Sequence, residues 1–179
     1  MKIIIGLGNP GKDYENTKHN LGFMFINYLQ NRYNLDKLKG FKNSKIIETN
    51  INNQKVVLAC PQTYMNLSGK AVVELKNWYK VENEDILIIY DDIDISFGDV
   101  RFREKGSSGT HNGMRDITNK LGSNDVPRLR IGTGGIKKER EELISFVLSK
   151  FSKEQIKEID CIFDKAYLKL EEFLDKTNN

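Results

Sequence analysis

At 179 residues, with 39% hydrophobic residues and a net charge of +3, the chain fits one globular domain that buries a single core. No apolar run approaches the roughly 18 residues of a membrane span, and the apolar run in residues 1–6 is too short for a signal peptide. Cys60 and Cys161 lie far apart and form no metal or disulfide pattern, so we expect a cytoplasmic protein without a membrane segment.

Short apolar runs alternate with amphipathic stretches along the chain. Strands are predicted at residues 2–7, 43–49, 55–60, 86–90, 100–103 and 128–132. Helices are predicted at residues 20–33, 67–79, 114–121, 139–148 and 153–175. Apolar faces are expected on the second helix (Ala71, Val72, Leu75, Trp78) and on the last, amphipathic one (Ile156, Ile159, Phe163, Ala166, Leu170, Phe173). Without repeats or a linker, this pattern predicts one α/β domain, residues 1–179, with a mixed or largely parallel sheet.

The sequence has two histidines, and an asparagine follows each of them: His19-Asn20 and His111-Asn112. Histidine exchanges a proton near neutral pH, and asparagine can hold a carbonyl or stabilise an oxyanion. Both pairs lie among Gly, Asn, Ser and Thr, a composition typical of functional loops. These pairs are therefore the first candidates for a catalytic site.

Residues 6–11, Gly-Leu-Gly-Asn-Pro-Gly, follow the first predicted strand and formally match the dinucleotide fingerprint GxGxxG. The match is poor because Pro10 has no amide donor, no helix begins at Gly11, and no acid follows about 20 residues later. The segment is then either a tight turn or a support that presents Asn9 at the carboxyl edge of the sheet.

Three acids, Asp91, Asp92 and Asp94, follow the predicted strand 86–90, so at least one should lie at that same edge. With the histidines they allow a metal site, although the spacing matches no tight ligand motif. A carboxylate could instead hold a histidine ring in one tautomer and stabilise the imidazolium. No Gly-x-Ser-x-Gly elbow is present and Cys60 is expected to be an inert buried thiol, so the attacking group would be water.

Two further segments have the composition of a binding site. Residues 64–69 lie between a strand and a helix, and the Gly/Ser-rich residues 106–113 offer backbone amides just before a helix. Basic residues crowd the stretch 101–140: Arg101, Arg103, Lys105, Arg115, Lys120, Arg128, Arg130, Lys137, Lys138 and Arg140. This crowding indicates either a face that binds a polyanion or a solvated basic surface.

Taken together, these segments resemble the bacterial peptidyl-tRNA hydrolase family in order and spacing. The matching motifs are Gly6-Leu-Gly-Asn-Pro-Gly11, Tyr14-x-x-Thr-Lys-His-Asn-x-Gly22, Thr63-Tyr-Met-Asn-Leu-Ser-Gly-Lys70, Asp91-Asp-x-Asp94, Gly109-Thr-His-Asn-Gly113 and Leu129-Arg-Ile-Gly132, with Phe146-Val-Leu later. They run from residue 3 to about residue 151. Lys18 stands where this family usually has Arg, and Thr110 where it usually has Gly.

The resemblance implies a cytoplasmic, usually monomeric enzyme that needs no metal or cofactor. Its reaction would be hydrolysis of the ester between a peptide and the 3′-terminal ribose of tRNA. The implied fold is a single α/β domain whose twisted, mixed sheet is flanked by helices on both faces.

The resemblance also implies roles for matching residues. His19 would be the base that activates water, Asp91 would hold His19, and Asn9 would help recognise a blocked, peptide-like amine. The substrate groove would be lined by Tyr14, Tyr64, Met65, Asn66 and Asn112. Either Asn66 or Asn112 would donate to the oxyanion, while His111 would orient its loop.

The basic stretch would then face the phosphates of the tRNA acceptor stem, with Arg103, Lys105 and Arg130 as hypothesised contacts. Three other interpretations remain open on the residues alone. They are a non-catalytic RNA-binding module, a metal-dependent hydrolase built on the histidines and the acids, and a nucleotide-dependent oxidoreductase. Retention of affinity without turnover after replacement of His19 would distinguish an enzyme from a binding module.

Overall fold

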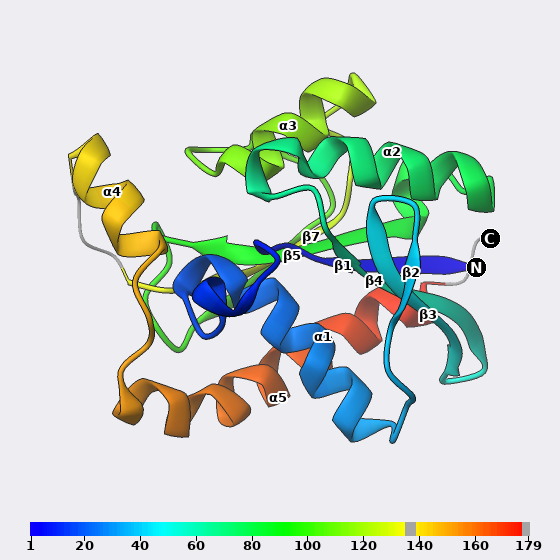
Figure 1. The fold of residues 1–179 in the computed structure, drawn as a ribbon. Helices are drawn as coiled ribbons and strands as arrows, with labels where there is room; N and C mark the ends of the chain where they lie inside the picture. The colour runs from blue at the N-terminus through cyan, green and yellow to red at the C-terminus, as the bar shows by residue number, and fades with distance from the viewer. Residues whose placement is uncertain (135–138, 177–179) are drawn as a thin grey trace.

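A seven-stranded mixed sheet forms the centre of the part of the chain that the structure describes (Figure 1). The computed structural model describes residues 1–134 and 139–176. The strands are β1 (Lys2–Gly6), β2 (Lys39–Phe41), β3 (Ser44–Ile51), β4 (Gln54–Pro61), β5 (Ile86–Asp92), β6 (Val100–Arg103) and β7 (Arg128–Gly132). Their order is β2-β3-β4-β1-β5-β7-β6. The central strands β4, β1, β5 and β7 run parallel, whereas β2, β3 and β6 pair antiparallel to their neighbours, which confirms the predicted mixed α/β sheet.

Local sequence explains the strands well. β1 and β5 are isoleucine-rich runs, and helices cover both faces of the sheet there, so nearly every residue of these strands is buried. β3 and β4 form a hairpin whose turn residues Asn52 and Asn53 have φ angles of 50° and 63°. Asparagine tolerates this left-handed conformation better than most residues do, so the predicted hairpin is confirmed.

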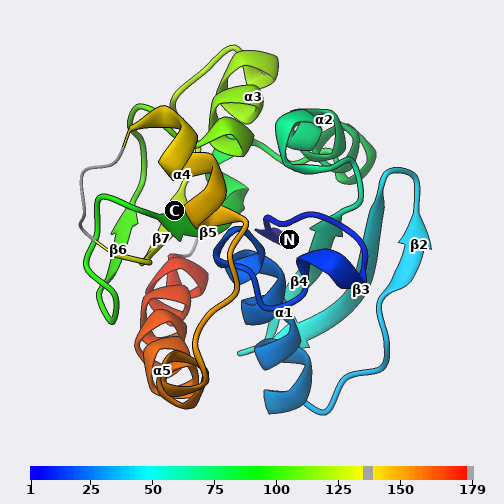
Figure 2. The same ribbon diagram turned by 60° about the vertical axis from the view of Figure 1, so that its left-hand side comes forward.

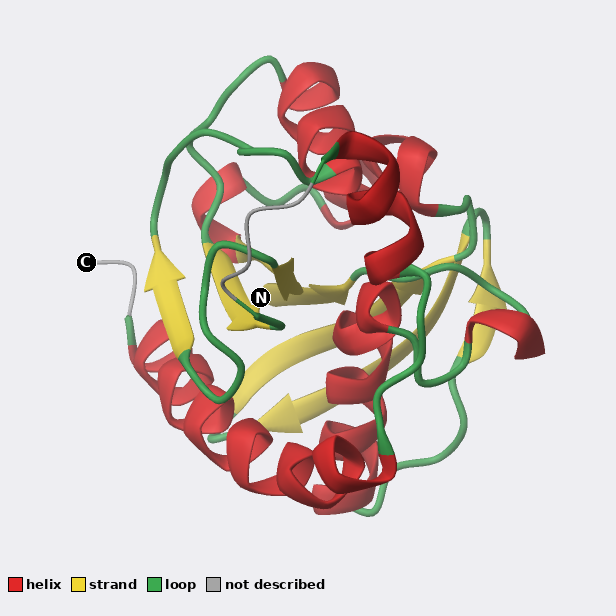
Figure 3. Ribbon diagram, turned by 90° about the vertical axis from the view of Figure 1, so that its left-hand side faces the viewer, coloured by secondary structure: helices red, strands yellow, loops and turns green. Residues whose placement is uncertain are grey.

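Helices cover both faces of the sheet. Within the described residues they are α1 (Leu21–Arg32), α2 (Ser68–Tyr79), α3 (Asn112–Leu121), α4 (Arg140–Val147) and α5 (Lys153–Asp175), with 3₁₀ turns η1 (Lys12–Tyr14), η2 (Lys18–Asn20), η3 (Met65–Leu67) and η4 (Asn83–Asp85). α1 and α5 lie on one face and α2 and α3 on the other (Figure 2), so the strands form a middle layer (Figure 3). None of the helices that the structure describes is both long enough and apolar enough to cross a membrane.

Each face of the sheet has its own apolar core. On one face, Phe25 of α1 and Phe163 of α5 pack edge to face with ring centroids 5.3 Å apart. On the other, Val72 of α2 and Met114 of α3 are buried against β1, β4 and β5. The two cores pack against the strands, whose ends carry the polar segments described below.

Some details differ from the predicted elements. The edge strand β2 was not predicted, because three residues are too few to show a periodic pattern. β5 continues through Asp91 and Asp92, which pair with β7, so these acids belong to the strand and not to the turn. Trp78 is 57% exposed, not buried as predicted, because it lies near the end of α2 and packs edge to face on Phe41 of β2. Ile156, in the first turn of α5, is likewise 39% exposed.

Candidate active site

The parallel strands bring several polar segments to one edge of the sheet. Asn9 follows β1, residues 64–66 follow β4, and Asp91 is the last residue but one of β5. The carboxyl ends of parallel strands share one edge, which is where α/β proteins bind their ligands. The turn η2 carries His19, and the N-terminus of α3 carries Asn112. The sequence prediction that these segments share an edge is thus confirmed for Asn9 and Asp91.

Close backbone contact determines where His19 lies. A Cβ atom on Gly22 would sit 2.3 Å from Leu7 N and 2.4 Å from Ile89 O, so only glycine lets the start of α1 approach β1 and β5 this closely. Phe23 N also donates to Leu7 O at 3.2 Å. Because η2 directly precedes this anchored helix end, His19 is held over the end of β5.

His19 and Asp91 form a buried hydrogen-bonded pair. His19 Nδ1 lies 3.1 Å from Asp91 Oδ1 and 2.9 Å from Oδ2, and the two residues are 8% and 2% exposed. An ionised carboxylate only accepts hydrogen bonds, so Nδ1 of His19 carries the hydrogen and Nε2 carries a lone pair. The neutral ring is therefore a base whose basic nitrogen is not engaged by Asp91.

The pKa values of this pair are shifted in opposite directions. Burial lowers the pKa of His19, but the charge of Asp91 and the hydrogen bond to it outweigh burial and raise this pKa above its ordinary value. Burial raises the pKa of Asp91, but its electrostatic interactions and hydrogen bonds with His19 and His111 hold it well below its usual range. Asp91 therefore stays ionised wherever His19 gains or loses its proton.

His111 contacts the same carboxylate. Its Nε2 lies 2.9 Å from Asp91 Oδ1, and its Nδ1 accepts the Met114 N–H at 3.1 Å as the N-cap of α3. Its ring centroid lies 4.9 Å from that of His19 and 4.7 Å from that of Tyr90. Both histidines thus meet at one carboxylate, an arrangement that the sequence did not predict for His111.

Asn9 is held by two neighbours. The Asn20 side chain accepts from Asn9 N at 2.8 Å and donates to Asn9 O at 2.9 Å. Asn9 Oδ1 in turn accepts from Met65 N at 2.8 Å. This bond fixes the orientation of the Asn9 amide and leaves its Nδ2 group to donate elsewhere. Asn20, noted in the sequence only as the neighbour of His19, is therefore the residue that positions Asn9.

Tyr14 and Tyr64 form an aromatic pair near this edge. Their ring centroids lie 6.3 Å apart at an interplanar angle of 72°, and Tyr64 is 56% exposed. Tyr64 has φ 60° and ψ 158°, a backbone conformation that residues other than glycine rarely adopt. This strained residue directly precedes η3, so the strain is stored where the chain presents its Met65 amide to Asn9.

The two candidate oxyanion donors lie on elements that touch. Asn66 belongs to η3 and Asn112 begins α3, and both side chains are exposed. A Cβ atom on Gly113 would sit 2.5 Å from the sulfur of buried Met65, so the absence of a side chain there lets α3 pack directly on η3. Neither asparagine is favoured over the other by this geometry.

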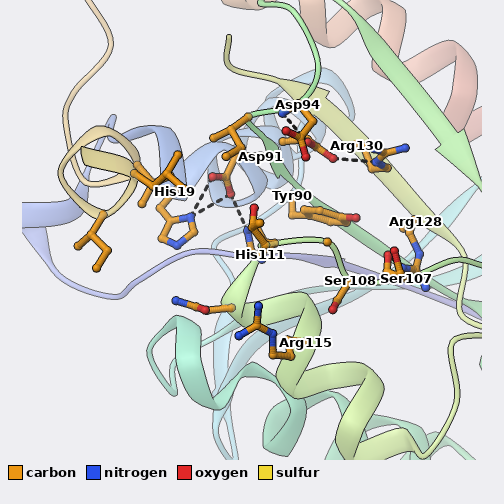
Figure 4. Close-up of a pocket in the computed structure, with 18 of the residues that line it drawn as sticks. His19, Tyr90, Asp91, Asp94, Ser107, Ser108, His111, Arg115, Arg128 and Arg130 are labelled. Carbon is orange, nitrogen blue, oxygen red and sulfur yellow. Dashed lines mark hydrogen bonds and ion pairs between the residues drawn. The ribbon is translucent and has the colours of Figure 1, made fainter. Parts of the chain in front are cut away.

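A cavity of about 570 Å³ opens at this edge. In Figure 4, His19, Asp91 and His111 gather at one end of it, Arg128 and Arg130 lie toward the other, and the Tyr90 ring lies between. The walls are His19, Asp91, His111 and Asn112; Arg103, Arg115, Arg128, Arg130, Ser107 and Ser108; and Leu143, Ile144 and Val147 of α4, among others. Asn9, Tyr14 and residues 64–66 lie outside these walls, as does Lys105, which is exposed.

The arginines of the cavity differ in what they bind. Arg128 is 1% exposed and donates to the carbonyl oxygens of Ser107, Asn124 and Val126, so its guanidinium holds two loops together. Arg130 donates through Nε to Asp92 Oδ2 at 2.8 Å. Its buried Nη1 has no hydrogen-bond partner in residues 1–134 and 139–176.

Of the other predicted basic residues, Arg103 is exposed at the cavity wall, and Lys137 and Lys138 lie outside the described residues. Helix α4 lines one side of the cavity, and Lys18 of η2 binds the segment that follows this helix. The buried Lys18 ammonium donates to Ser149 Oγ at 2.9 Å and to Lys150 O at 3.0 Å, and it lies 4.8 Å from the centre of the Phe146 ring. The segment after α4 is therefore anchored one residue away from His19.

His19, Asp91 and His111 also form a group with the composition of a metal site, with candidate ligand atoms within 4.8 Å of one another. However, Nδ1 of His19 and Nε2 of His111 both point at the carboxylate as hydrogen-bond donors. A metal ligand must offer a lone pair, and His111 already uses its other lone pair to cap α3. A metal held between Nδ1 of His19 and Nε2 of His111 would require the ring hydrogens to leave both of these nitrogens, so these hydrogen bonds favour an acid–base site.

Several residues of the cavity were not singled out from the sequence. Arg115 and Arg128 were noted only as members of the basic stretch, and Ser107 and Ser108 only within the Gly/Ser loop. The apolar wall of α4 gave no recognisable signal, because Leu143, Ile144 and Val147 match an ordinary amphipathic helix.

Comparison with known proteins agrees with this geometry. Residues 3–179 match the model of the family described as peptidyl-tRNA hydrolase. A peptidyl-tRNA hydrolase of Clostridium perfringens is 47% identical over 166 residues, which cover 90% of this chain and 85% of that protein. One from Chloroflexus aurantiacus is 53% identical over 135 residues, covering 75% of this chain and 72% of that protein. The crystal structure of the enzyme from Acinetobacter baumannii superposes with a TM-score of 0.86 at 34% identity, over 98% of this chain and 93% of that one.

Proposed function

The chain belongs to the peptidyl-tRNA hydrolase family and hydrolyses an ester bond, and we propose that His19 activates the water that attacks this ester. The observation that carries the proposal is the hydrogen bond between His19 Nδ1 and the buried Asp91 carboxylate at 2.9 Å. It leaves a lone pair on Nε2, the atom that must accept a proton from water.

The proposed reaction has two steps. Water gives a proton to His19 Nε2 while its oxygen bonds to the ester carbonyl carbon, and the carbonyl oxygen becomes an oxyanion. The tetrahedral intermediate then collapses, and the bond to the ribose 3′-oxygen breaks. That oxygen takes the proton from the imidazolium, so the products are a peptide acid and tRNA. Asp91 stabilises the imidazolium between the two steps.

The oxyanion needs hydrogen-bond donors close to its final position. The side-chain amides of Asn66 and Asn112 are the candidates, because their elements pack together beside the histidines. Replacing each asparagine separately by alanine would identify the donor as the variant whose kcat falls by about 10²–10³-fold. The other variant would change mainly KM.

Recognition of the substrate amine is proposed for Asn9. Its Nδ2 group is oriented by the bonds to Met65 and Asn20 and can donate to a peptide carbonyl, which a free aminoacyl ester lacks. Tyr14, Tyr64 and Met65 would line the path of the peptide. Their apolar surface favours side chains of many kinds over one particular residue.

The acceptor stem of tRNA is proposed to lie against the basic wall of the cavity. Arg103 is exposed there, and Arg130, whose Nη1 has no hydrogen-bond partner among the described residues, lines the same cavity, so both are proposed phosphate contacts. Lys105 lies outside the cavity and would contact a phosphate farther along the stem. Arg103→Glu should weaken binding and lower the slope of log Kd against log salt by about one unit. Lys157→Glu, an equal charge change on the exposed face of α5, is the matched control.

The decisive test is cleavage of N-acetyl-aminoacyl-tRNA beside free aminoacyl-tRNA, with a chelator present. Rapid cleavage of the first substrate alone is expected. His19→Ala should retain substrate affinity and lose turnover, whereas a metal-dependent hydrolase would fail already in the chelator. We further propose that the enzyme acts as a monomer in the cytoplasm, which sedimentation and cell fractionation would check.

A further inference from the structure

The protonation state of His111 is determined by its two hydrogen bonds. Its Nδ1 accepts the backbone N–H of Met114 at 3.1 Å, and a peptide amide can only donate. Nδ1 therefore carries a lone pair, which places the ring hydrogen on Nε2. That hydrogen points at Asp91 Oδ1, 2.9 Å away. The imidazole has no other nitrogen, so both of its hydrogen-bonding positions are used inside the protein.

We propose that His111 is a positioning residue: a hydrogen-bond donor, held in the Nε2–H tautomer by α3, that turns the Asp91 carboxylate toward His19. The inference rests on the proposed role of His19 as the base and adds a residue to that machinery. Held by His111 through Oδ1, Asp91 presents Oδ2 to His19 Nδ1 at 2.9 Å. His111 thus orients the Asp91 carboxylate, and the N-terminus of α3 in turn orients His111.

Helix α3 needs Nδ1 of His111 as a hydrogen-bond acceptor. A proton on Nδ1 would face the Met114 N–H and remove the side-chain cap of α3. The His111 side chain is 8% exposed, so water cannot easily replace the lost bond. His19 differs because its Nε2 is not used by Asp91. One carboxylate therefore holds two histidines whose second nitrogens differ: Nδ1 of His111 caps α3, whereas Nε2 of His19 is not used by Asp91.

The charged and titratable groups around His111 come from several elements. Asp91 and the Tyr90 ring come from β5 and His19 from η2, while Arg115 lies on α3. From β7, Arg128 bonds to loop carbonyls and Arg130 to Asp92, and Arg140 of α4 lines the same cavity. The carboxylate is paired with histidines alone among the ion pairs of the described chain. A change at His111 should therefore be felt first by Asp91 and His19.

Two variants separate positioning from simple helix capping. In His111→Asn, the amide oxygen takes the place of Nδ1, and asparagine is among the best N-cap residues, but no donor reaches Asp91. In His111→Gln, the amide nitrogen takes the place of Nε2 and can still donate to Asp91, but glutamine caps helices poorly. Each variant thus keeps one of the two hydrogen bonds.

We expect H111N to keep the thermal midpoint of the wild type. Its kcat/KM for N-acetyl-aminoacyl-tRNA should fall about 10–100-fold, the usual effect of losing an orienting partner. Its acid limb should move to higher pH, because a carboxylate that has lost a donor stabilises the imidazolium of His19 more strongly. H111Q should recover much of this loss and restore the acid limb, despite a lower thermal midpoint. If H111N matches the wild type in rate and pH profile, His111 is only a cap and the proposal is overturned.

A measurement on the wild type tests the tautomer without any assay of activity. Nitrogen-15 NMR of the two imidazoles should show His111 with a hydrogen on Nε2 and a lone pair on Nδ1 at the pH of the activity assay. A hydrogen on Nδ1 of His111 at that pH would overturn the proposal even if the enzyme is active. Conversely, lack of hydrolysis with the expected NMR pattern would refute the proposed function and leave the tautomer assignment standing.

Discussion

Replacing Asp91 by asparagine probes how the carboxylate controls His19. The amide has one acceptor and one donor group, so it must choose which faces each histidine. His111 presents an Nε2–H to the Oδ1 position, because its Nδ1 caps α3. The amide oxygen therefore stays at Oδ1, and the new NH₂ group occupies Oδ2, 2.9 Å from His19 Nδ1. That group would donate to Nδ1 and move the ring hydrogen of His19 to Nε2, where the reaction needs a lone pair.

The size of the effect follows from two terms. If the amide turned its oxygen toward His19, the correct tautomer of His19 would be restored, but the NH₂ group would then face the His111 N–H. Two donors that face each other in a buried site are left unsatisfied, at a cost of about 1–3 kcal/mol. Loss of the carboxylate charge beside the imidazolium removes about 1.5–3 kcal/mol, the strength of a hydrogen bond to a charged group. Together they amount to about 2.5–6 kcal/mol, or a decrease of about 10²–10⁴-fold in kcat/KM.

The assay is single-turnover cleavage of N-acetyl-aminoacyl-tRNA, with the substrate dissociation constant measured separately and expected to be unchanged. The double variant D91N/H111N supplies a sharper test. Without the His111 N–H, the amide can turn its oxygen to His19, so the double variant should be more active than D91N alone. A D91N enzyme within tenfold of the wild type, or a double variant no better than D91N, would refute this reasoning.

Three further predictions concern other parts of the site and the fold. The acid limb of kcat/KM should lie above pH 6.5, the ordinary pKa of histidine, because Asp91 raises the pKa of His19. The base form of His19 is lost as the pH falls through that raised value. An acid limb at or below pH 6.5 would contradict the proposal that His19 is the base. Asn9→Ala should reduce the preference for N-acetyl-aminoacyl-tRNA over aminoacyl-tRNA by about 10–100-fold, because one hydrogen bond of about 1–3 kcal/mol is lost. The control Asn119→Ala, on the exposed face of α3, should leave this preference unchanged. Gly22→Ala should lower the free energy of unfolding in urea by about 1–3 kcal/mol or more, because its Cβ would lie 2.3 Å from Leu7 N. In the control Gly40→Ala, no atom lies within 4 Å of the added Cβ, so the free energy of unfolding should change by no more than about 0.5 kcal/mol.

The sequence predicted the sheet and most helices because these elements are encoded locally. The isoleucine runs of β1 and β5 and the Asn52-Asn53 turn are local signals. The prediction for Trp78 was wrong because helical spacing identifies a face without showing how far the sheet beneath it extends. β2 is set by pairing with β3 at the sheet edge, and three residues cannot encode this alone.

The candidate site was predictable to a lesser extent, and the reason is geometric. His19, Asp91 and Asn9 could be assigned because each follows or precedes a recognisable element with matching motifs. The role of Asn20 could not, because it depends on two bonds to the backbone of Asn9 and not on its own chemistry. The apolar wall of α4 was missed for a similar reason, since a helix sequence shows that one face is apolar and not which cavity that face lines.

The difference between the two histidines illustrates why composition alone could not assign them. Both rings lie against Asp91, both are flanked by asparagine, and their side chains are 10% and 8% exposed. What separates them is one backbone amide, the N–H of Met114, which occupies Nδ1 of His111 and has no counterpart at Nε2 of His19 in the hydrogen bonds of the described residues. A helix that begins at Asn112 must have its first amides satisfied, and His111 satisfies one of them with its Nδ1 lone pair. The proposed base, His19, is therefore the histidine whose side chain caps no helix among the described residues.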